Sequence, residues 1–277
     1  GTQVEGVEKI LVLLYADDLV LICEDGEALA EIMRRIEEST QKWGLTINVK
    51  KTKRMVNKTN GTPNEVTTEN RGECVQREDW FVYLGRLITN TGSVHKEIER
   101  RLQLGQYRFN ELKKPIFDQE TISRETKVNI YKAIVLPTIL YGSETWTCTD
   151  KEYNRLNTVN NKMLRQIVGK KRDEIHNLEL HKVTNTDPID RYVIRQRLRW
   201  AGHVRRMPDC RIPKKVMFGN LVGGKKCKGR PLKTWIDCFE EDLERIKLNR
   251  WNWLKKAEHR LAWADSLSSL TSNKRKK

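Results

Sequence analysis

No two cysteines in this 277-residue sequence have the Cys-x-x-Cys spacing. This lack argues against both a disulfide framework and a standard zinc site, and it favours a reducing intracellular compartment. One alternative stays open, a structural zinc protein, with four ligands at spacings that match no common zinc pattern: His203, Cys210, Cys227 and Cys238. The other cysteines are Cys23, Cys74 and Cys148.

The sequence also lacks any run near the roughly 18 to 20 apolar residues that a membrane-spanning helix needs. Charged residues make up 32% of the chain and hydrophobic residues 38%, which is enough to bury a core. The chain begins with Gly1, without an initiator methionine or an apolar signal segment. We therefore expect a soluble intracellular protein with no membrane partner, and a fragment of a longer chain is one alternative.

Acidic residues are scarce in one part of the chain. Residues 1–90 contain 12 basic and 15 acidic side chains, whereas residues 165–233 contain 19 basic and 6 acidic side chains. Such a density of positive charge is typical of a surface that faces a phosphate backbone, and a solvated basic face is the alternative. Trp200, Phe218 and Trp235 alternate with these cations and could stack on bases, which favours nucleic acid.

Two short apolar runs near the N-terminus predict a buried β-hairpin. They cover Ile10–Leu14 and Leu19–Cys23, and Tyr15-Ala16-Asp17-Asp18 separates them. A helix is expected over Gly26–Trp43 with Gly44 as its stop, then strands over Thr46–Val49 and Lys53–Val56. Another strand pair surrounds Gly85, within Trp80–Ile88. The expected fold class is therefore α+β.

Long helical patterns follow Gly92. They predict helices over Val94–Lys114, Ser123–Leu140 and Lys151–Val168, and a further helix after Asp187-Pro188 that runs to about Arg206. A basic, glycine-rich connector, Pro208–Pro231, then leads to a last predicted helix, Leu232–Trp263.

Adjacent carboxylates at a hairpin turn are costly, because like charges at contact distance repel each other. A hard cation such as Mg²⁺, or Mn²⁺, would balance Asp17 and Asp18 and keep coordination sites for substrate phosphates. Two-metal phosphoryl transfer uses such carboxylates. On the two residues alone, an Asp-rich turn with no ligand is an equal alternative.

An ordered series of motifs resembles the reverse transcriptases of non-LTR, LINE-like retroelements. Leu14–Asp18 (LYADD) is similar to the family's [YF]xDD box, Gly44–Lys53 (GLTINVKKTK) to its GLxxNxxKT segment, and Phe81–Gly85 (FVYLG) to its YLG primer grip. Segments similar to the C-terminal parts of endonuclease and reverse transcriptase polyproteins follow at Leu140–Trp146, Arg197–Met207 and Lys228–Pro231. The resemblance covers about residues 8–245.

The resemblance implies roles for individual residues in RNA-directed DNA synthesis, with an RNA template, a DNA primer and dNTPs as partners. Asp17 would be the principal metal ligand and Asp18 would support the geometry. Lys51 would lie near the triphosphate, although a solvated lysine is the alternative. The primer end would be held by Tyr83, Leu84 and Gly85, and Tyr83 could equally be strand core.

The family's pattern includes a third carboxylate on an upstream strand, together with fingers, and neither is present in this sequence. We therefore expect the isolated chain to be inactive and to depend on an upstream part of a polyprotein that carries the fingers, the first catalytic Asp and, as one alternative, an endonuclease. The competing hypothesis is a non-catalytic RNA- or DNA-binding protein derived from a retroelement, in which YADD is a relic.

The resemblance divides the chain into a partial palm (residues 1–92), a helical thumb-like region (93–147) and a basic helical nucleic-acid-binding region (148–277). Location in the nucleus or in a cytoplasmic ribonucleoprotein is expected from the function, and the basic C-terminal tail fits either a nuclear signal or a solvated end.

Trp200 and Val204 are one helical turn apart and are predicted to form a buried stripe on their helix. The basic residues expected to contact nucleic acid are Lys50, Lys53, Arg199, Arg205, Arg206, Lys225, Lys226, Lys228 and Arg230.

Overall fold

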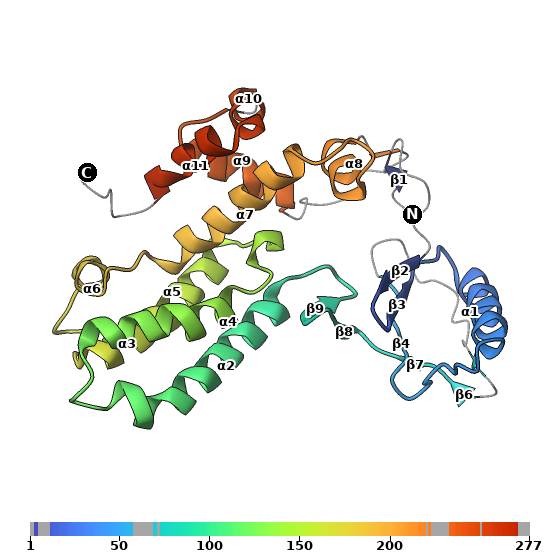
Figure 1. The fold of residues 1–277 in the computed structure, drawn as a ribbon, viewed down its shortest axis with the longest axis horizontal. Coiled ribbons are helices and arrows are strands. Elements are labelled where there is room, and N and C mark those ends of the chain that lie inside the picture. The colour runs from blue at the N-terminus through green and yellow to red at the C-terminus, as the bar shows by residue number, and fades with distance from the viewer. Residues whose placement is uncertain are drawn as a thin grey trace. The chain divides into compact units, whose positions relative to one another are not determined.

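Two compact units make up the chain, and each is described separately. In the computed structural model, the described residues are 3–4, 12–57, 69–70, 73–219, 221–222, 233–249 and 251–270. The first unit contains Gly1–Ser93 and Asp209–Cys227, and the second contains Val94–Pro208 and Lys228–Lys277. Small β-hairpins occur in the first unit and helices dominate the second (Figure 1), which confirms the α+β class.

The two predicted hairpins of the first unit are confirmed. Strand β2 (Val12–Tyr15) pairs antiparallel with β3 (Asp18–Leu21), and β8 (Trp80–Tyr83) pairs antiparallel with β9 (Arg86–Thr89). The remaining strands are two residues long: β1 (Gln3–Val4) pairs with β10 (Leu221–Val222), β4 (Lys53–Arg54) with β7 (Gln76–Arg77), and β5 (Glu69–Asn70) with β6 (Glu73–Cys74). Each described sheet therefore has two strands.

Helix α1 (Gly26–Gln41) forms where the apolar periodicity predicted it. Its N-cap, Asp25, accepts a hydrogen bond from the Ala28 backbone nitrogen at 2.7 Å, and Met33 is buried. Gly44 follows with φ +68°, a conformation that glycine adopts without a steric penalty.

Two predictions for this unit are wrong. Thr46–Val49 is not a strand, because Asn48 begins a turn and its carbonyl and side-chain oxygens both accept from the Lys51 backbone nitrogen. The β2–β3 hairpin is not buried on both faces either, since Leu14 is 74% exposed and Tyr15 64% exposed. A two-stranded hairpin has no flanking strands within the described residues to cover it.

Helix α2 (His95–Leu112) opens the second unit and continues into a π-helical turn, Lys113–Phe117. The second predicted helix consists of α3 (Arg124–Ile130), a π-helical turn (Tyr131–Val135) and α4 (Leu136–Leu140). Pro137 lies at the start of α4 and has no backbone N–H to donate. The wider π turn lies directly before this helix.

Helices α5 (Asp150–Val168), α6 (Asn177–Val183) and α7 (Ile189–Arg205) follow, and the predictions for α5 and α7 are confirmed. Thr149 and Glu152 form a capping box at the start of α5. Asn157 of α5 caps α7 from outside: its Oδ1 accepts from the Ile189 backbone nitrogen, and its Nδ2 donates to Asp190, both at 2.9 Å.

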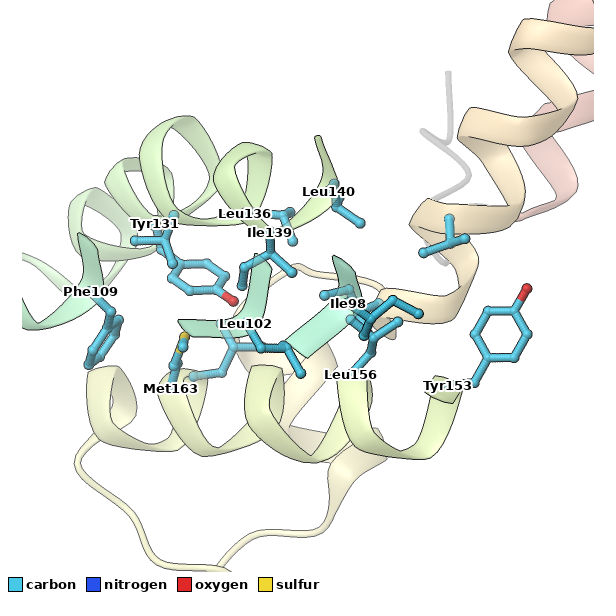
Figure 2. Packing of buried hydrophobic residues seen from close by; sticks show 14 of the residues in the cluster. Ile98, Leu102, Phe109, Tyr131, Leu136, Ile139, Leu140, Tyr153, Leu156 and Met163 are labelled. Carbon is cyan, nitrogen blue, oxygen red and sulfur yellow. The ribbon is translucent and has the colours of Figure 1, made fainter. Parts of the chain in front are cut away.

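One apolar cluster joins α2, α4 and α5. Leu102, Ile139 and Met163 come from these three helices and point toward a shared interior (Figure 2). The cluster continues from Val94 to Val193, so it includes residues on both sides of the expected boundary at 147/148. The distinct roles expected for residues 93–147 and 148–277 stay predictions.

The single helix predicted over Leu232–Trp263 is wrong. Three helices occupy this stretch: α9 (Trp235–Arg245), α10 (Asn252–Glu258) and α11 (Arg260–Leu267). Lys247 has φ +57° and ends the α9 path, and Asn249 caps the next helix through its side-chain oxygen. Within the predicted connector, α8 (Ile212–Phe218) forms a further short helix in the first unit.

The C-terminal helices α9, α10 and α11 lie beside α7 (Figure 1). Aromatic rings pack these helices against one another and against α7. Trp235 stacks on Phe239 at 5.3 Å between centroids, and Trp263 donates from Nε1 to the Leu198 carbonyl at 3.0 Å. A Cβ on Gly202 would lie 2.2 Å from Trp263 Nε1, so only glycine fits under this ring. Trp200 contacts Trp235 edge to face at 5.2 Å, which favours core packing over base stacking.

Candidate functional site

The β2–β3 turn presents two adjacent carboxylates to solvent. Tyr15 pairs with Asp18, so Ala16 and Asp17 are the two residues of the turn itself. Ala16 has φ +51°, a left-handed conformation that is uncommon for alanine. Asp17 and Asp18 are both exposed at this tip.

These two side chains fit part of a metal site. Carboxylate oxygens are the ligands that Mg²⁺ prefers, and exposure lets the ion keep its waters. Within the described ranges neither Asp17 nor Asp18 forms an ion pair, so none of the described cations neutralises them. The described residues also contain no group of three or more His, Cys, Asp or Glu side chains that could enclose a metal ion. Asp17 and Asp18 therefore supply only part of a ligand set.

The basic residues after Gly44 differ in their surroundings. Lys50 and Lys51 are exposed, and the turn at Asn48 fixes the Lys51 backbone. Lys53 Nζ instead donates to the Gln76 side chain and pairs with Glu78 at 3.4 Å. Lys51 is thus available to an incoming anion, whereas Lys53 is engaged with the neighbouring strand.

The predicted primer-grip residues form the tip of the β8–β9 hairpin. Leu84 and Gly85 are the two turn residues, with φ +46° and +74°, and two positive φ values are typical of the tight turns that join antiparallel strands. Tyr83 pairs with Arg86 and is half-buried, so the strand-core alternative for Tyr83 stays open.

Three basic residues near the end of α7 were expected to contact nucleic acid. Arg199 is exposed. Arg205 pairs with Glu258, and Arg206 Nη1 donates to the Ala257 carbonyl at 2.6 Å. The other predicted cations of this kind lie outside the described residues: Lys225, Lys226, Lys228 and Arg230.

Arg197 is a buried ion-pair residue that the sequence analysis did not single out. Its guanidinium is fully buried, pairs with Asp242 of α9, and donates to the Trp146 carbonyl at 2.7 Å. Burial raises the pKa of the Asp242 carboxyl, and the Arg197 charge opposes that rise. The signal was present in the sequence, because Arg197 falls on the apolar stripe that includes Val193 and Val204.

The zinc alternative gains no support within the described part of the chain. Cys238 is buried and donates to the Cys148 carbonyl at 3.8 Å, whereas Cys210 is exposed. Burial raises the pKa of the Cys148 thiol to about 12. Cys227 lies outside the described residues. No described helix is long and apolar enough to cross a membrane.

The N-terminal residues match a known protein family. The model of the reverse transcriptase (RNA-dependent DNA polymerase) family matches residues 2–88, which include the β2–β3 hairpin and all of the β8–β9 hairpin except its last residue, Thr89. No solved structure matches the chain.

Three relatives connect the chain with mobile elements. A transposon-derived protein of Caenorhabditis elegans is 27% identical over 239 residues, which are 83% of this chain and 84% of that protein. The RNA-directed DNA polymerases from mobile element jockey of Drosophila funebris and Drosophila melanogaster are 25% and 24% identical over 58% of this chain. The chain spans only 18% of the length of each jockey polymerase. The family match and these relatives together show that the chain is similar to the reverse transcriptases of non-LTR retrotransposons, and that residues 2–88 match the reverse transcriptase family.

Proposed function

We propose that the chain acts in RNA-directed DNA synthesis as part of a larger polymerase, and that residues 1–92 are a palm segment. One observation carries the proposal: the adjacent carboxylates Asp17 and Asp18 lie exposed at the tip of an antiparallel hairpin, inside the residues that match the reverse transcriptase family. Exposure at a turn suits a ligand shared with substrate phosphates better than it suits a structural role.

Each residue of the segment has its own part in the proposed reaction. A divalent ion, Mg²⁺ or Mn²⁺, would supply electrostatic stabilisation of the phosphates when bound. Asp17 would hold it, and Asp18 would orient the turn. Lys51 would stabilise negative charge on the departing pyrophosphate from its exposed position, and Tyr83 to Gly85 would hold the primer end. Residues 93–147 would serve as a thumb.

The proposed partners are an RNA template, a DNA primer, dNTPs and an upstream polyprotein segment with the fingers and the first catalytic Asp. Two carboxylates do not complete a two-metal site, so residues 1–277 alone are proposed to lack polymerase turnover. The proposed location is the nucleus or a cytoplasmic ribonucleoprotein.

Primer extension tests this assignment. The purified chain should not extend a primed RNA template with dNTPs and Mg²⁺, while it should bind the primed template. Extension that is lost on Asp17→Ala would contradict the proposed incompleteness and still support the role of Asp17. Extension that Asp17→Ala leaves unchanged would contradict the role of Asp17.

A non-catalytic nucleic-acid-binding protein is the second candidate. The excess of basic side chains in residues 165–233 favours binding whatever the state of the hairpin. Divalent ions separate the candidates: a polymerase segment should bind a primed template more tightly with Mg²⁺ in wild type than in Asp17→Asn/Asp18→Asn. Equal affinities of both proteins across Mg²⁺ concentrations would favour the non-catalytic binder.

A further inference from the structure

Trp251 is a large aromatic side chain that the fold leaves in solvent. It directly precedes α10 and is 76% exposed, whereas Trp253 is 4% exposed within the aromatic cluster. The backbone at Trp251 is fixed, because Asn249 Oδ1 accepts from the backbone nitrogens of Trp251 at 3.0 Å and Asn252 at 2.8 Å. An indole on a fixed backbone offers a flat apolar face with little conformational entropy to lose on binding.

Three cations follow Trp251 in the sequence. Lys255 lies one helical turn after Trp251, and Lys256 follows it. Arg260 begins α11, which packs against α10. All three cations are exposed, and none of them forms an ion pair within the described residues. Their charge is therefore available to a partner.

Arg206, the residue directly after α7, is a fourth cation. Its hydrogen bond to the Ala257 carbonyl holds it against α10. Burial lowers the pKa of Arg206, and the charge of nearby Arg260 lowers it further. Helices α10 and α11 contain two acidic side chains. Glu258 of α10 is already paired with Arg205, and Asp265 of α11 is exposed. Like charges held close together favour the binding of an anion.

We propose that Trp251, Lys255, Lys256, Arg206 and Arg260 form a binding surface for single-stranded RNA or DNA. A base would stack on the Trp251 indole, and the four cations would neutralise the phosphates on either side of it. The inference rests on the proposed function for the class of partner, which is nucleic acid. The residues of the surface are inferred from the arrangement of α7, α10 and α11. A duplex presents phosphates but no open base face, so the indole predicts a preference for single strands.

Binding of a labelled single-stranded RNA and of its duplex tests the role of Trp251. Trp251→Ala should raise the Kd for the single strand by about tenfold, the loss of one base stack, and leave the duplex Kd unchanged. Trp251→Phe keeps an aromatic face and should retain most of the affinity. Leu178→Ala is the matched control, because Leu178 is 78% exposed on α6 of the same unit and should not affect binding.

The salt dependence tests the cations. Lys255→Gln/Lys256→Gln should reduce the slope of log K against log salt concentration by about 1.4, since each phosphate contact on a single strand contributes about 0.7. Far-ultraviolet circular dichroism and the midpoint of urea unfolding should match wild type, because both side chains are exposed.

Three outcomes would overturn the inference in distinguishable ways. If wild type and Trp251→Ala bind the single strand equally and with the same salt slope, the proposed function stands and this surface is wrong. If wild type binds no nucleic acid, both fail. Stronger loss on Trp251→Ala for vesicles of anionic phospholipid than for RNA would assign the surface to lipid and also contradict the inference.

Discussion

His181 illustrates how a single side chain couples pH to the stability of the second unit. It is buried, its Nδ1 lies 3.0 Å from Thr186 Oγ1, and Thr186 Oγ1 lies 2.8 Å from Thr184 Oγ1. Thr184 donates to the Leu180 carbonyl, so the chain of hydrogen bonds is complete when Thr186 donates to Thr184 and neutral His181 donates from Nδ1. These hydrogen bonds require a proton on Nδ1, and burial of the ring favours its neutral form.

Burial lowers the pKa of His181 below its ordinary value of 6.5; Asp187 and Asp190 oppose this shift, and Arg191 and Arg165 add to it. The unfolded chain then binds a proton more readily than the folded chain. The stability from neutral His181 is fully present above pH 6.5 and is lost as the pH falls through the lowered pKa. The free energy of unfolding should decrease more steeply from pH 7 to pH 5 in wild type than in His181→Gln. Parallel profiles of urea unfolding would contradict this account.

At the scale of elements, the buried ion pair between Arg197 and Asp242 joins α7 to α9. Arg197→Met would leave the Asp242 carboxylate buried without a cation, and should destabilise the fold by about 3–5 kcal/mol. Arg197→Met/Asp242→Leu removes both charges and should recover most of that loss.

The exposed pair between Arg155 and Glu99, 2.7 Å apart, is the matched control for this prediction. Arg155→Met should cost no more than about 1 kcal/mol, because water already solvates both partners. Urea unfolding of all three variants measures the difference. Equal effects of Arg197→Met and Arg155→Met would mean that the buried pair does not stabilise the contact between α7 and α9.

Elements that depend on local signals were predicted well. Apolar periodicity, helix caps and glycine at positive φ determine where these elements begin and end: the two hairpins, α1, α5 and α7. Each of these signals lies within a few residues of the sequence. The break between α9 and α10 was missed, because the apolar residues Phe239, Leu243 and Ile246 continue a helical spacing up to it. Asn249 was the available signal, since asparagine favours a helix N-cap.

Features that depend on distant residues were not predictable in this way. Arg197 binds a carboxylate 45 positions later in the chain, and the exposure of the β2–β3 hairpin depends on which strands lie beside it. The carboxylate pair was found because its chemistry is local to the turn. The roles of Lys51 and Tyr83 depend on substrates and stay predictions.

At the scale of the whole molecule, we propose that the β2–β3 hairpin binds a divalent ion and that the basic helical part binds nucleic acid. Most of the positive charge lies after residue 90, whereas residues 1–90 are slightly acidic. Salt should therefore weaken nucleic-acid binding by the second unit more than it weakens metal binding by the first.

Paramagnetic broadening by Mn²⁺ tests the central claim about the hairpin most directly. In amide nuclear magnetic resonance spectra of the chain, Mn²⁺ should first broaden the signals of residues 15–18, and Asp17→Asn/Asp18→Asn should remove that broadening while the rest of the spectrum stays unchanged. Broadening centred elsewhere in wild type, or broadening of residues 15–18 that persists in the double variant, would contradict a metal-binding role for Asp17 and Asp18.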